Sequence, residues 1–493
     1  MATPARQQYL DIKSNHPNDI LLFRMGDFYE TFDDDAKMVA KDLEIALTSR
    51  EMGKGEKIPL AGIPYHSLDG YLSKLISKGH RIAICEQTSD PSESKGIVDR
   101  EVVRIVTPGT VVEDQLLERN INNYLGSVVI QDNYAGVSYV DITTTEFLTT
   151  ELPINDLAAE INRINPTELI ISQPLPEQLL DRIDVYVTLL DKGFFIKSSS
   201  GKIIEQNFEV SSLESFGCKE QPLATQAAAQ IIEYLKKHQI SALESIPTLK
   251  TYSTEPFMAL DHQTSRNLEI FSTGRNESQE SSLFSILDKT ESPMGGRLLR
   301  KWLGQPLLDL ELLENRQKAV EWFMRESVRR GEISTLLKNI SDIERLTTKI
   351  KMRTAGPRDL VGLGNSLEMT PDLVDLASQG NDVGDIEWVL DEFTDNTKTY
   401  DLIKNSIELE TPAIVGEGRT IKLGFSKTLD SLKKESSKAK DKMANIESSE
   451  KEKTGIKSLK IGYNRVFGYY IEVSKSYIEQ VPPEYIRDRK SVV

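Results

Sequence analysis

The sequence predicts a multidomain protein that joins mixed α/β units to an all-α region, and three observations support this fold class. The chain has 493 residues, which is too long for one hydrophobic core and suggests roughly three to four domains. As far as about residue 255, short apolar runs alternate with runs of helical spacing, which is typical of α/β units. Beyond about residue 257 helical spacing dominates, and a long charged helical run precedes two short strand-like runs.

The first predicted unit covers residues 1–115 and is mixed α/β. A strand over 19–24 stops at a Gly-Asp pair, and Phe28, Tyr29 and Glu30 follow it. If that segment is extended, Phe28 and Glu30 share one face while Tyr29 points to the other. The plain alternative is a short amphipathic strand with one ring in the core. The rest of the unit is expected to contain a helix that begins at the acidic triplet 33–35, a helix capped by Ser67, and strands over 80–86 and 101–106.

The second predicted unit covers residues 116–256 and is also α/β. Its expected elements are strands over 126–131, 136–143 and 146–152, a helix over 155–165, a strand over 168–172 and a helix over 224–238. Asp141 at a strand end raises the alternative of a nuclease, but no second and third carboxylate follow at convincing positions. We therefore expect a structural or surface role for Asp141.

Residues 257–425 are predicted to be all-α. Ser292 and Pro293 mark a helix start, because Pro is favoured at the first helical position. Further helical runs are expected over 310–329, 333–352 and 357–367. None of these runs carries recognisable chemistry, so we expect packed helices that position other domains.

Residues 426–493 are predicted to form an extended helical arm followed by a β-hairpin. Over 426–452 the apolar and small residues recur at alternating three- and four-residue steps, the spacing of a coiled-coil seam: Leu429, Leu432, Ser436, Ala439, Met443 and Ile446. So narrow a stripe cannot be buried in a globule, and we expect a partner helix along one side. Strands are expected over 457–463 and 468–474, joined by a turn, with a basic tail over 486–490.

Charge is unevenly distributed along the chain. The net charge of −16 should repel nucleic acid as a whole. Residues 426–493 nevertheless hold 15 basic and 10 acidic residues, a net charge of +5, whereas residues 1–115 hold 14 basic and 19 acidic residues, a net charge of −5. A nucleic-acid-binding protein of this kind would grip phosphates at its basic end and read bases with a tip that is not a basic patch.

Several classes of protein are disfavoured by the composition. Cys85 and Cys218 lie far apart, so a disulfide framework is not expected and a reducing compartment fits. The five histidines show no metal-ligand spacing, and three adjacent aspartates at 33–35 cannot converge on one ion, so we expect no metal site. The first residues lack a signal-peptide core, and no apolar run approaches ~18 residues, so a cytoplasmic location is expected.

The sequence contains no phosphate loop of the form GxxxxGK[ST]. The glycines at 53–55 and 416–418 lack both the spacing and the Lys-Ser/Thr pair, so the chain as given is not expected to hydrolyse ATP. It stops at Val493 just past the predicted hairpin, with no returning helix for the arm. We expect either a fragment of a longer protein or a truncated form.

Several sequence blocks resemble the MutS family of DNA mismatch-repair proteins. These are AGIPYHSLDGYLSKL (61–75), IAICEQ (82–87), REVVRIVTPGTV (100–111), LDHQTSRNLEI (260–270), GGRLLRKWLGQPLLD (295–309) and RTAGPRDL (353–360). The Phe-x-Glu motif of the family falls on Phe28 and Glu30. The resemblance implies a mismatch-recognition domain over 1–115, a ribonuclease-H-like connector over 116–256, a helical core or lever over 257–425, and part of a DNA clamp over 426–493.

The resemblance also implies roles for individual residues and partners. Phe28 would stack on a mispaired base from the minor groove, Glu30 would hydrogen-bond that base, and Leu60 would approach the groove opposite Phe28. Contacts to the DNA backbone are expected from Lys457, Arg489 and Lys490. No cofactor is expected in this chain, because ATP and Mg²⁺ belong to a carboxy-terminal, DNA-dependent ATPase domain of the family. The implied partners are mismatched duplex DNA, a second copy in the full-length homodimer, a MutL-type repair protein and the replication sliding clamp, with no membrane and a nucleoid-associated location.

Two alternatives from other classes remain. A DNA-processing nuclease would use the second α/β unit, and Mg²⁺-dependent cleavage of plain or mismatched duplex would reveal it. An architectural relative would bind branched DNA without inspecting bases. The pairing of Phe28 with Glu30 argues against the architectural relative.

Overall fold

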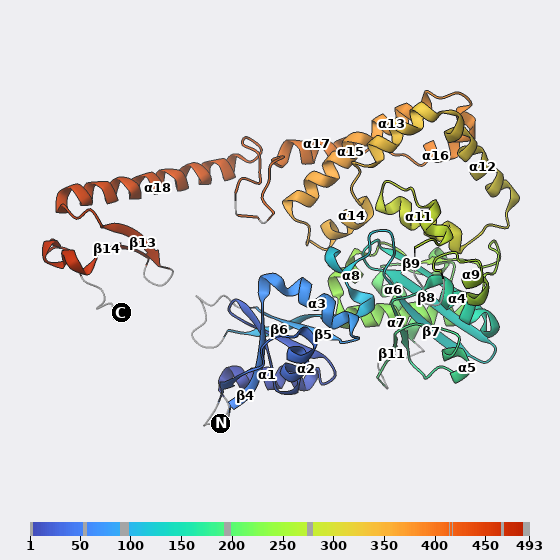
Figure 1. The fold of residues 1–493 in the computed structure, drawn as a ribbon, viewed down its shortest axis with the longest axis horizontal. Coiled ribbons are helices and arrows are strands. Elements are labelled where there is room, and N and C mark those ends of the chain that lie inside the picture. The colour runs from blue at the N-terminus through green and yellow to red at the C-terminus, as the bar shows by residue number, and fades with distance from the viewer. Residues whose placement is uncertain are drawn as a thin grey trace.

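The structure is a computed structural model that describes residues 3–52, 57–88, 98–191, 199–273, 280–413, 415–416, 418–464 and 468–486. Two α/β bodies lie side by side, a layer of helices covers the second body, and one long helix projects away from that layer (Figure 1). This arrangement is the mixed α/β and all-α architecture that the sequence predicts. Among the described residues, no helix has both the length and the apolar composition needed to cross a membrane.

The first body is built on a six-stranded mixed sheet with the order β3-β4-β2-β1-β5-β6. The strands are β1 (Ile20–Met25), β2 (Phe28–Phe32), β3 (Thr48–Glu51), β4 (Lys57–Pro64), β5 (Ile82–Gln87) and β6 (Arg100–Val106). Helix α1 (Pro4–Asn15) packs on one face, where the ring of Tyr9 lies 4.7 Å from that of Phe32. Helices α2 (Asp33–Leu43) and α3 (Leu68–Ser77) pack on the other face. Alternate residues of the five strands other than β3 therefore face two different cores.

Some details of the first body differ from the sequence-based expectation, and one prediction is confirmed. Strands β3 and β4 were not predicted, because β3 is exposed at all four positions and β4 contains two prolines. Ser67 precedes α3, but its side chain makes no capping hydrogen bond. The predicted helix at the acidic triplet is confirmed as α2, which has all three aspartates in its first turn.

The second body contains another six-stranded sheet, with the order β11-β10-β7-β8-β9-β12. Its strands are β7 (Tyr124–Gln131), β8 (Tyr134–Asp141), β9 (Glu146–Pro153), β10 (Glu168–Ile171), β11 (Val187–Leu189) and β12 (Lys250–Thr251), and its helices are α4 (Leu157–Ile164), α5 (Glu177–Leu180), α6 (Ser200–Asn207), α7 (Pro222–His238) and α8 (Ile240–Ser245). Helix α7 crosses the sheet directly at Gly136, where an added Cβ would lie 2.1 Å from the backbone of Leu223. All six elements predicted in this unit are confirmed, with small shifts at their ends.

The helical layer consists of α9 (His262–Asn267), α10 (Leu283–Leu287), α11 (Pro293–Gly304), α12 (Leu310–Arg325), α13 (Ser327–Leu337), α14 (Ile343–Lys351), α15 (Pro357–Ser378), α16 (Glu387–Leu390) and α17 (Thr397–Ser406). The start of α11 is confirmed, since the Ser292 side chain accepts a hydrogen bond from the Gly295 amide. The prediction of one helix over 333–352 is wrong. The chain breaks after α13, and Asp342 begins α14 as its N-cap. The predicted run 310–329 likewise divides into α12 and α13 at Glu326.

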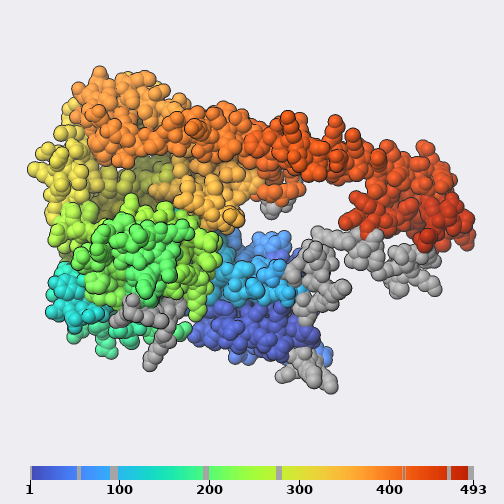
Figure 2. Space-filling model, turned by 180° about the vertical axis from the view of Figure 1, so that it is seen from behind, coloured from blue at the N-terminus to red at the C-terminus, as the bar shows by residue number. Residues whose placement is uncertain are grey.

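The arm is confirmed as a single helix, α18 (Lys427–Thr454), followed by β13 (Lys460–Asn464) and β14 (Gly468–Glu472), which pair antiparallel. None of its described residues is buried, and the seam residues Leu432 and Ile446 are exposed. The expected turn between the two strands falls on residues 465–467, which lie outside the described residues. Viewed from the front and from behind, the arm and the first body lie on the same side of the molecule (Figures 1 and 2).

Candidate nucleic-acid interface

A two-residue turn places Phe28 at one end of the first sheet. Gly26 has a φ of +63°. The residues on either side of the Gly26-Asp27 turn, Met25 and Phe28, are paired across β1 and β2. A positive φ at the first turn position is typical of a type II′ hairpin, which favours Gly there. The turn is held by a hydrogen bond of 3.0 Å from the Tyr65 amide to the Asp27 carbonyl. Because the turn is this tight, Phe28 is the first residue of β2 and lies at the edge of the body.

The side chains of β2 alternate between the surface and the core. Phe28 is 47% exposed, whereas Tyr29 is only 4% exposed. Tyr29 belongs to the core that includes α2 and α3, and its hydroxyl bonds the Glu86 carboxylate. Phe28 lies on the opposite face, the one that α1 covers at Phe32. The hydrophobic ring at position 28 therefore contributes little to either core.

Glu30 shares the face of Phe28 and is mostly shielded from water. Its side chain is 15% exposed. Among the residues that the structure describes, its polar partner is Arg50, whose Nη1 lies 3.4 Å from both carboxylate oxygens. Burial raises the pKa of Glu30 above its ordinary value, and the Arg50 charge and hydrogen bond oppose that rise. The net direction is upward, so Glu30 takes up a proton more readily than a solvated glutamate.

Gly62 keeps the space between Phe28 and Glu30 open. It pairs with Glu30 across β2 and β4, and directly paired residues point to the same face of a sheet. A Cβ added at Gly62 would lie 3.8 Å from both the Phe28 ring and the Glu30 side chain. The backbone of β4 therefore forms a floor beneath the two side chains.

The remaining predicted site residues lie elsewhere. Leu60 is paired with Phe32 on the same face, partly packed against the α1 core, and four residues along β4 from Pro64, which pairs with Phe28. At about 3.3 Å per residue this separation is roughly 13 Å. Lys457 is exposed between α18 and β13. Arg489 and Lys490 lie outside the described residues.

Sequence reasoning missed two residues near the same turn, on the face of the sheet that carries Tyr29. Arg24 lies with its guanidinium carbon 3.9 Å from the ring centroid of Tyr65, and Tyr65 is itself 45% exposed. Arg24 also approaches Glu86, at 3.8 Å. An aromatic residue directly after an X-Pro step was the only available signal for Tyr65. Nothing in the sequence indicated the pairing of Arg50 with Glu30.

Comparison with known proteins identifies the family of this chain. Three family models match the chain: MutS domain I over residues 3–115, MutS domain II over 123–247 and MutS domain III over 263–480. The chain belongs to the MutS family. Phe28, Glu30 and Leu60 fall within the MutS domain I match, and Lys457 falls within the MutS domain III match.

Curated relatives agree with the family models. The chain is 44% identical over 490 residues to a protein of Dehalococcoides mccartyi, covering 99% of this chain and 57% of the relative. It is 43% identical over 501 residues to a protein of Methanococcoides burtonii, and 42% identical over 499 residues to one of Halothermothrix orenii, covering 98% of this chain and 56% and 55% of those relatives. All three are named DNA mismatch repair protein MutS. The chain thus spans a little over half the length of these relatives.

Asp141, at the end of β8 in the MutS domain II match, has its carboxylate held by hydrogen bonds in a buried turn. Its carboxylate is fully buried and accepts hydrogen bonds from the side chain of Asn122 and from the amide and hydroxyl of Thr143, at 2.7–2.8 Å. With its lone pairs engaged in this turn, Asp141 is not free to bind a cation. Within the described part of the chain, no group of three or more His, Cys, Asp or Glu side chains is arranged to hold a metal ion.

Proposed function

We propose that this chain recognises mispaired or unpaired bases in duplex DNA, with Phe28 as the inserted residue. The observation that carries the proposal is a half-exposed aromatic ring at a tight turn, next to a shielded carboxylate on the same face. A ring in this place can enter a base stack, and a carboxylate two residues on can reach the edge of the same base. The relatives' name, and the match of this region to MutS domain I, support the same function.

Discrimination would come from the deformability of the DNA. A mispaired base has lost part of its stacking, so a kink costs less there than at a paired step. Bending a paired site costs about 1–6 kcal/mol. Stacking of one base on an aromatic side chain returns about 1–3 kcal/mol. Because the two ranges overlap, the free energy of stacking on Phe28 would offset the cost of the kink where the base is already loosened. At a paired step, where the kink costs more, it would not.

Glu30 would add selectivity in two ways. As an anion it repels the phosphates of any duplex. This repulsion lowers the affinity for paired sites, which are in large excess. Protonated, it can donate a hydrogen bond to an acceptor nitrogen of the displaced base. The raised pKa of Glu30 in the DNA-free chain makes that proton easier to acquire. We further propose that Leu60 contacts the groove from farther along β4.

The wider organisation is proposed by resemblance. We assign residues 1–115 to mismatch recognition, 116–256 to a ribonuclease-H-like connector, 257–425 to the helical core or lever, and 426–493 to part of a DNA clamp. Lys457, Arg489 and Lys490 would contact the DNA backbone. The first body and the arm project on the same side of the molecule, which suits a duplex held by both (Figure 2).

The whole protein would have further partners. A homodimer, a MutL-type repair protein and the replication sliding clamp are proposed by resemblance, as is a nucleoid-associated location. The same resemblance assigns ATP and Mg²⁺ to a domain that would follow Val493. The steps proposed above involve only residues of this chain.

The deciding experiment compares two Phe→Ala variants. Phe28→Ala should remove the preference for a duplex with one G·T pair or one extra base over the matched duplex, while weak, salt-sensitive binding remains. Phe393→Ala is the control, because Phe393 is similarly exposed (43%) but lies in the helical layer. Dissociation constants for the mismatched and matched duplexes are measured at fixed salt. Full discrimination by Phe28→Ala, or stronger competition by a four-way junction than by the mismatched duplex, would refute the proposal.

A further inference from the structure

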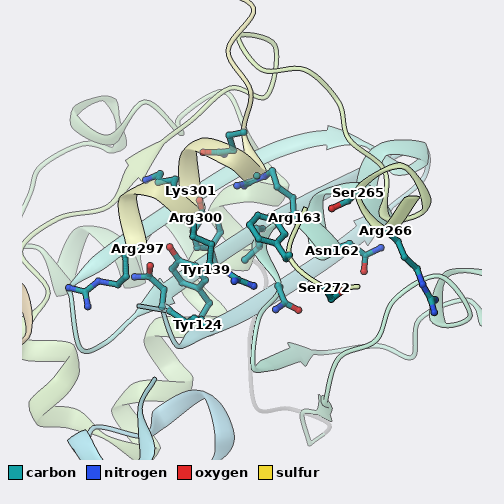
Figure 3. A pocket seen from close by; sticks show the side chains of 17 residues that line it. Tyr124, Tyr139, Asn162, Arg163, Ser265, Arg266, Ser272, Arg297, Arg300 and Lys301 are labelled. Atoms are coloured by element: carbon teal, nitrogen blue, oxygen red, sulfur yellow. The ribbon is translucent and has the colours of Figure 1, made fainter. Parts of the chain in front are cut away.

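A cavity of about 290 Å³ lies between the second body and the helical layer, far from β2 in the sequence and in the fold. Its volume is at the small end of the roughly 300–1,000 Å³ that ligand pockets occupy. Figure 3 shows its lining, in which Arg300 and Tyr139 lie near the middle, Arg297 at one end and Arg266 at the other. Both units contribute, since Arg163 comes from α4 and Arg300 from α11.

The lining has an unusual charge for this protein. Five of its residues are basic and none is acidic, in a chain whose net charge is −16. The basic residues are Arg163, Arg266, Arg297, Arg300 and Lys301. Hydroxyl and amide side chains, such as Ser265, Ser272 and Asn162, make up much of the remaining polar lining. A cavity with these groups and without carboxylates selects anions.

Three of these cations are held in place by carboxylates that do not line the cavity. Arg163 makes two hydrogen bonds to Glu160, at 2.6 and 2.8 Å. Arg297 is bound by Asp342 and Glu344, and Lys301 by Glu146, in each case at 2.5–2.7 Å. These pairs fix the positions of the charges and neutralise part of them.

Arg300 differs from these three. Its Nη1 is buried and has no hydrogen-bond partner in the structure. Its guanidinium carbon lies 4.4 Å from the ring centroid of Phe271 and 5.5 Å from that of Phe284. The rings orient the guanidinium plane but accept no conventional hydrogen bond from its edge. A buried charged donor without an acceptor is costly, and a turn of the Arg300 side chain toward the cavity would let an anion there accept from it and remove that cost.

We propose that this cavity binds a small phosphate-bearing anion, with Arg300 as its principal donor and cations from both units around it. A guanidinium matches phosphate oxygens in a two-pronged geometry that a lysine cannot reproduce. Two sources share this chemistry, namely free phosphate and the phosphate of a small nucleotide, for which Tyr124, Tyr139 and Phe271 would provide apolar contact. A DNA duplex is too large to enter a cavity of this volume.

The test is isothermal titration of the whole chain with inorganic phosphate and, separately, with adenosine monophosphate, at constant ionic strength set with sodium chloride. We expect saturable binding of at least one probe, weakened at least tenfold in Arg300→Gln. Arg300→Lys should recover part of the loss, since it keeps the charge but not the fork. Arg316→Gln is the matched control. Arg316 also stacks on an aromatic ring of the helical layer, with its guanidinium carbon 3.7 Å from the Trp302 ring centroid, but it does not line the cavity.

The outcomes separate cleanly. Tighter binding of adenosine monophosphate than of phosphate, lost in Arg300→Gln, supports the proposal with a nucleotide as the source. Equal or tighter binding of free phosphate, with the same loss, supports it with free phosphate as the source. No saturable heat above the chloride background, or the same affinity in Arg300→Gln and in the parent chain, overturns it and leaves an adventitious ion only. The Phe28→Ala experiment concerns a different site, so its outcome does not affect this result.

Discussion

Phe28 keeps nearly half of its side chain in water, although burying the exposed part would stabilise the fold by about 2 kcal/mol. Single exposed apolar residues are normal on protein surfaces, so this exposure alone does not identify a site. The distinguishing feature is the set of residues that surround Phe28. Glu30 is shielded on the same face with one long ion pair to Arg50, and Gly62, which has no side chain, leaves the backbone of β4 as the floor beneath both side chains. An apolar ring and a carboxyl that readily accepts a proton can therefore approach one base together.

At the residue scale, the raised pKa of Glu30 predicts a pH dependence of DNA binding. As pH falls toward the pKa, Glu30 gains a proton and its repulsion of the phosphates disappears, so affinity for matched duplex should increase. Glu30→Gln carries no charge at any pH. It should bind matched duplex more tightly than the parent chain at pH 8, and this difference should shrink as pH falls. Dissociation constants measured between pH 8 and pH 5.5 at constant salt test this expectation.

Glu101→Gln is the matched control for Glu30→Gln, because Glu101 is an exposed carboxylate on the edge strand β6 of the same sheet. It should leave the pH dependence of the parent chain unchanged. If Glu30→Gln kept the full pH dependence, the repulsion attributed to Glu30 would have to come from another group.

At the element scale, the sequence predicts strands and helices that carry a clear apolar period, and it fails where tertiary pairing decides. The alternation of Phe28, Tyr29 and Glu30 gives the correct faces of β2, because a strand has a period of two. Strand β3 has no buried residue, so no apolar pattern marks it. Strand β4 contains two prolines, which argue against a strand in a sequence-based prediction. The helix break before Asp342 was missed because the apolar spacing continues across it. Without β3 and β4, neither the Arg50 partner of Glu30 nor the Gly62 floor could be predicted.

The turn of the β1–β2 hairpin is the element on which the position of Phe28 depends. Gly26→Ala forces an L-residue to a φ near +63°, which costs roughly 1–2 kcal/mol, even though no atom lies within 4 Å of the new Cβ. The urea midpoint of the first body should fall accordingly, and discrimination between mismatched and matched duplex should weaken with it. Gly70→Ala is the control, since Gly70 lies in α3 with equally open surroundings and without a positive φ. That change should instead stabilise the chain by about 0.5–1 kcal/mol. Equal effects of the two substitutions would contradict the strained-turn account.

At the scale of the whole molecule, buried arginines connect the bodies. Arg297 of α11 binds Asp342 and Glu344 and donates to the Arg119 carbonyl in the segment between the two α/β bodies. Arg345 of α14 donates to the carbonyls of Glu118 and Ile121 in the same segment. These contacts attach the segment after the first body to the helical layer, so a force on one body is transmitted through a few fixed hydrogen bonds.

The junction between the first and second bodies predicts a loss of stability in mild acid. His238 at the end of α7 donates from Nδ1 to the Tyr234 carbonyl at 2.7 Å, which leaves Nε2 to accept from Arg81 at 3.1 Å. Arg81 is also bound by Asp19 at 2.8 Å. Burial lowers the pKa of His238 to about 4, with Lys237 and the Arg81 charge acting in the same direction. A protonated ring would turn an N–H toward the Arg81 guanidinium, so protonation and this contact exclude each other.

The sign of the effect follows from comparing the two states. The unfolded histidine takes up a proton near its ordinary pKa of 6.5, whereas the folded one resists until about pH 4. The stabilisation is therefore complete above about pH 6.5 and is lost as pH falls toward 4, by roughly 3 kcal/mol over that window. Urea unfolding at pH 7.5 and pH 5 should show the loss in the parent chain. His238→Gln, which stays neutral, should have a lower midpoint at pH 7.5 but a flatter pH dependence, whereas the exposed His66→Gln should behave like the parent. An equally steep dependence in His238→Gln would move the acid sensitivity to another group.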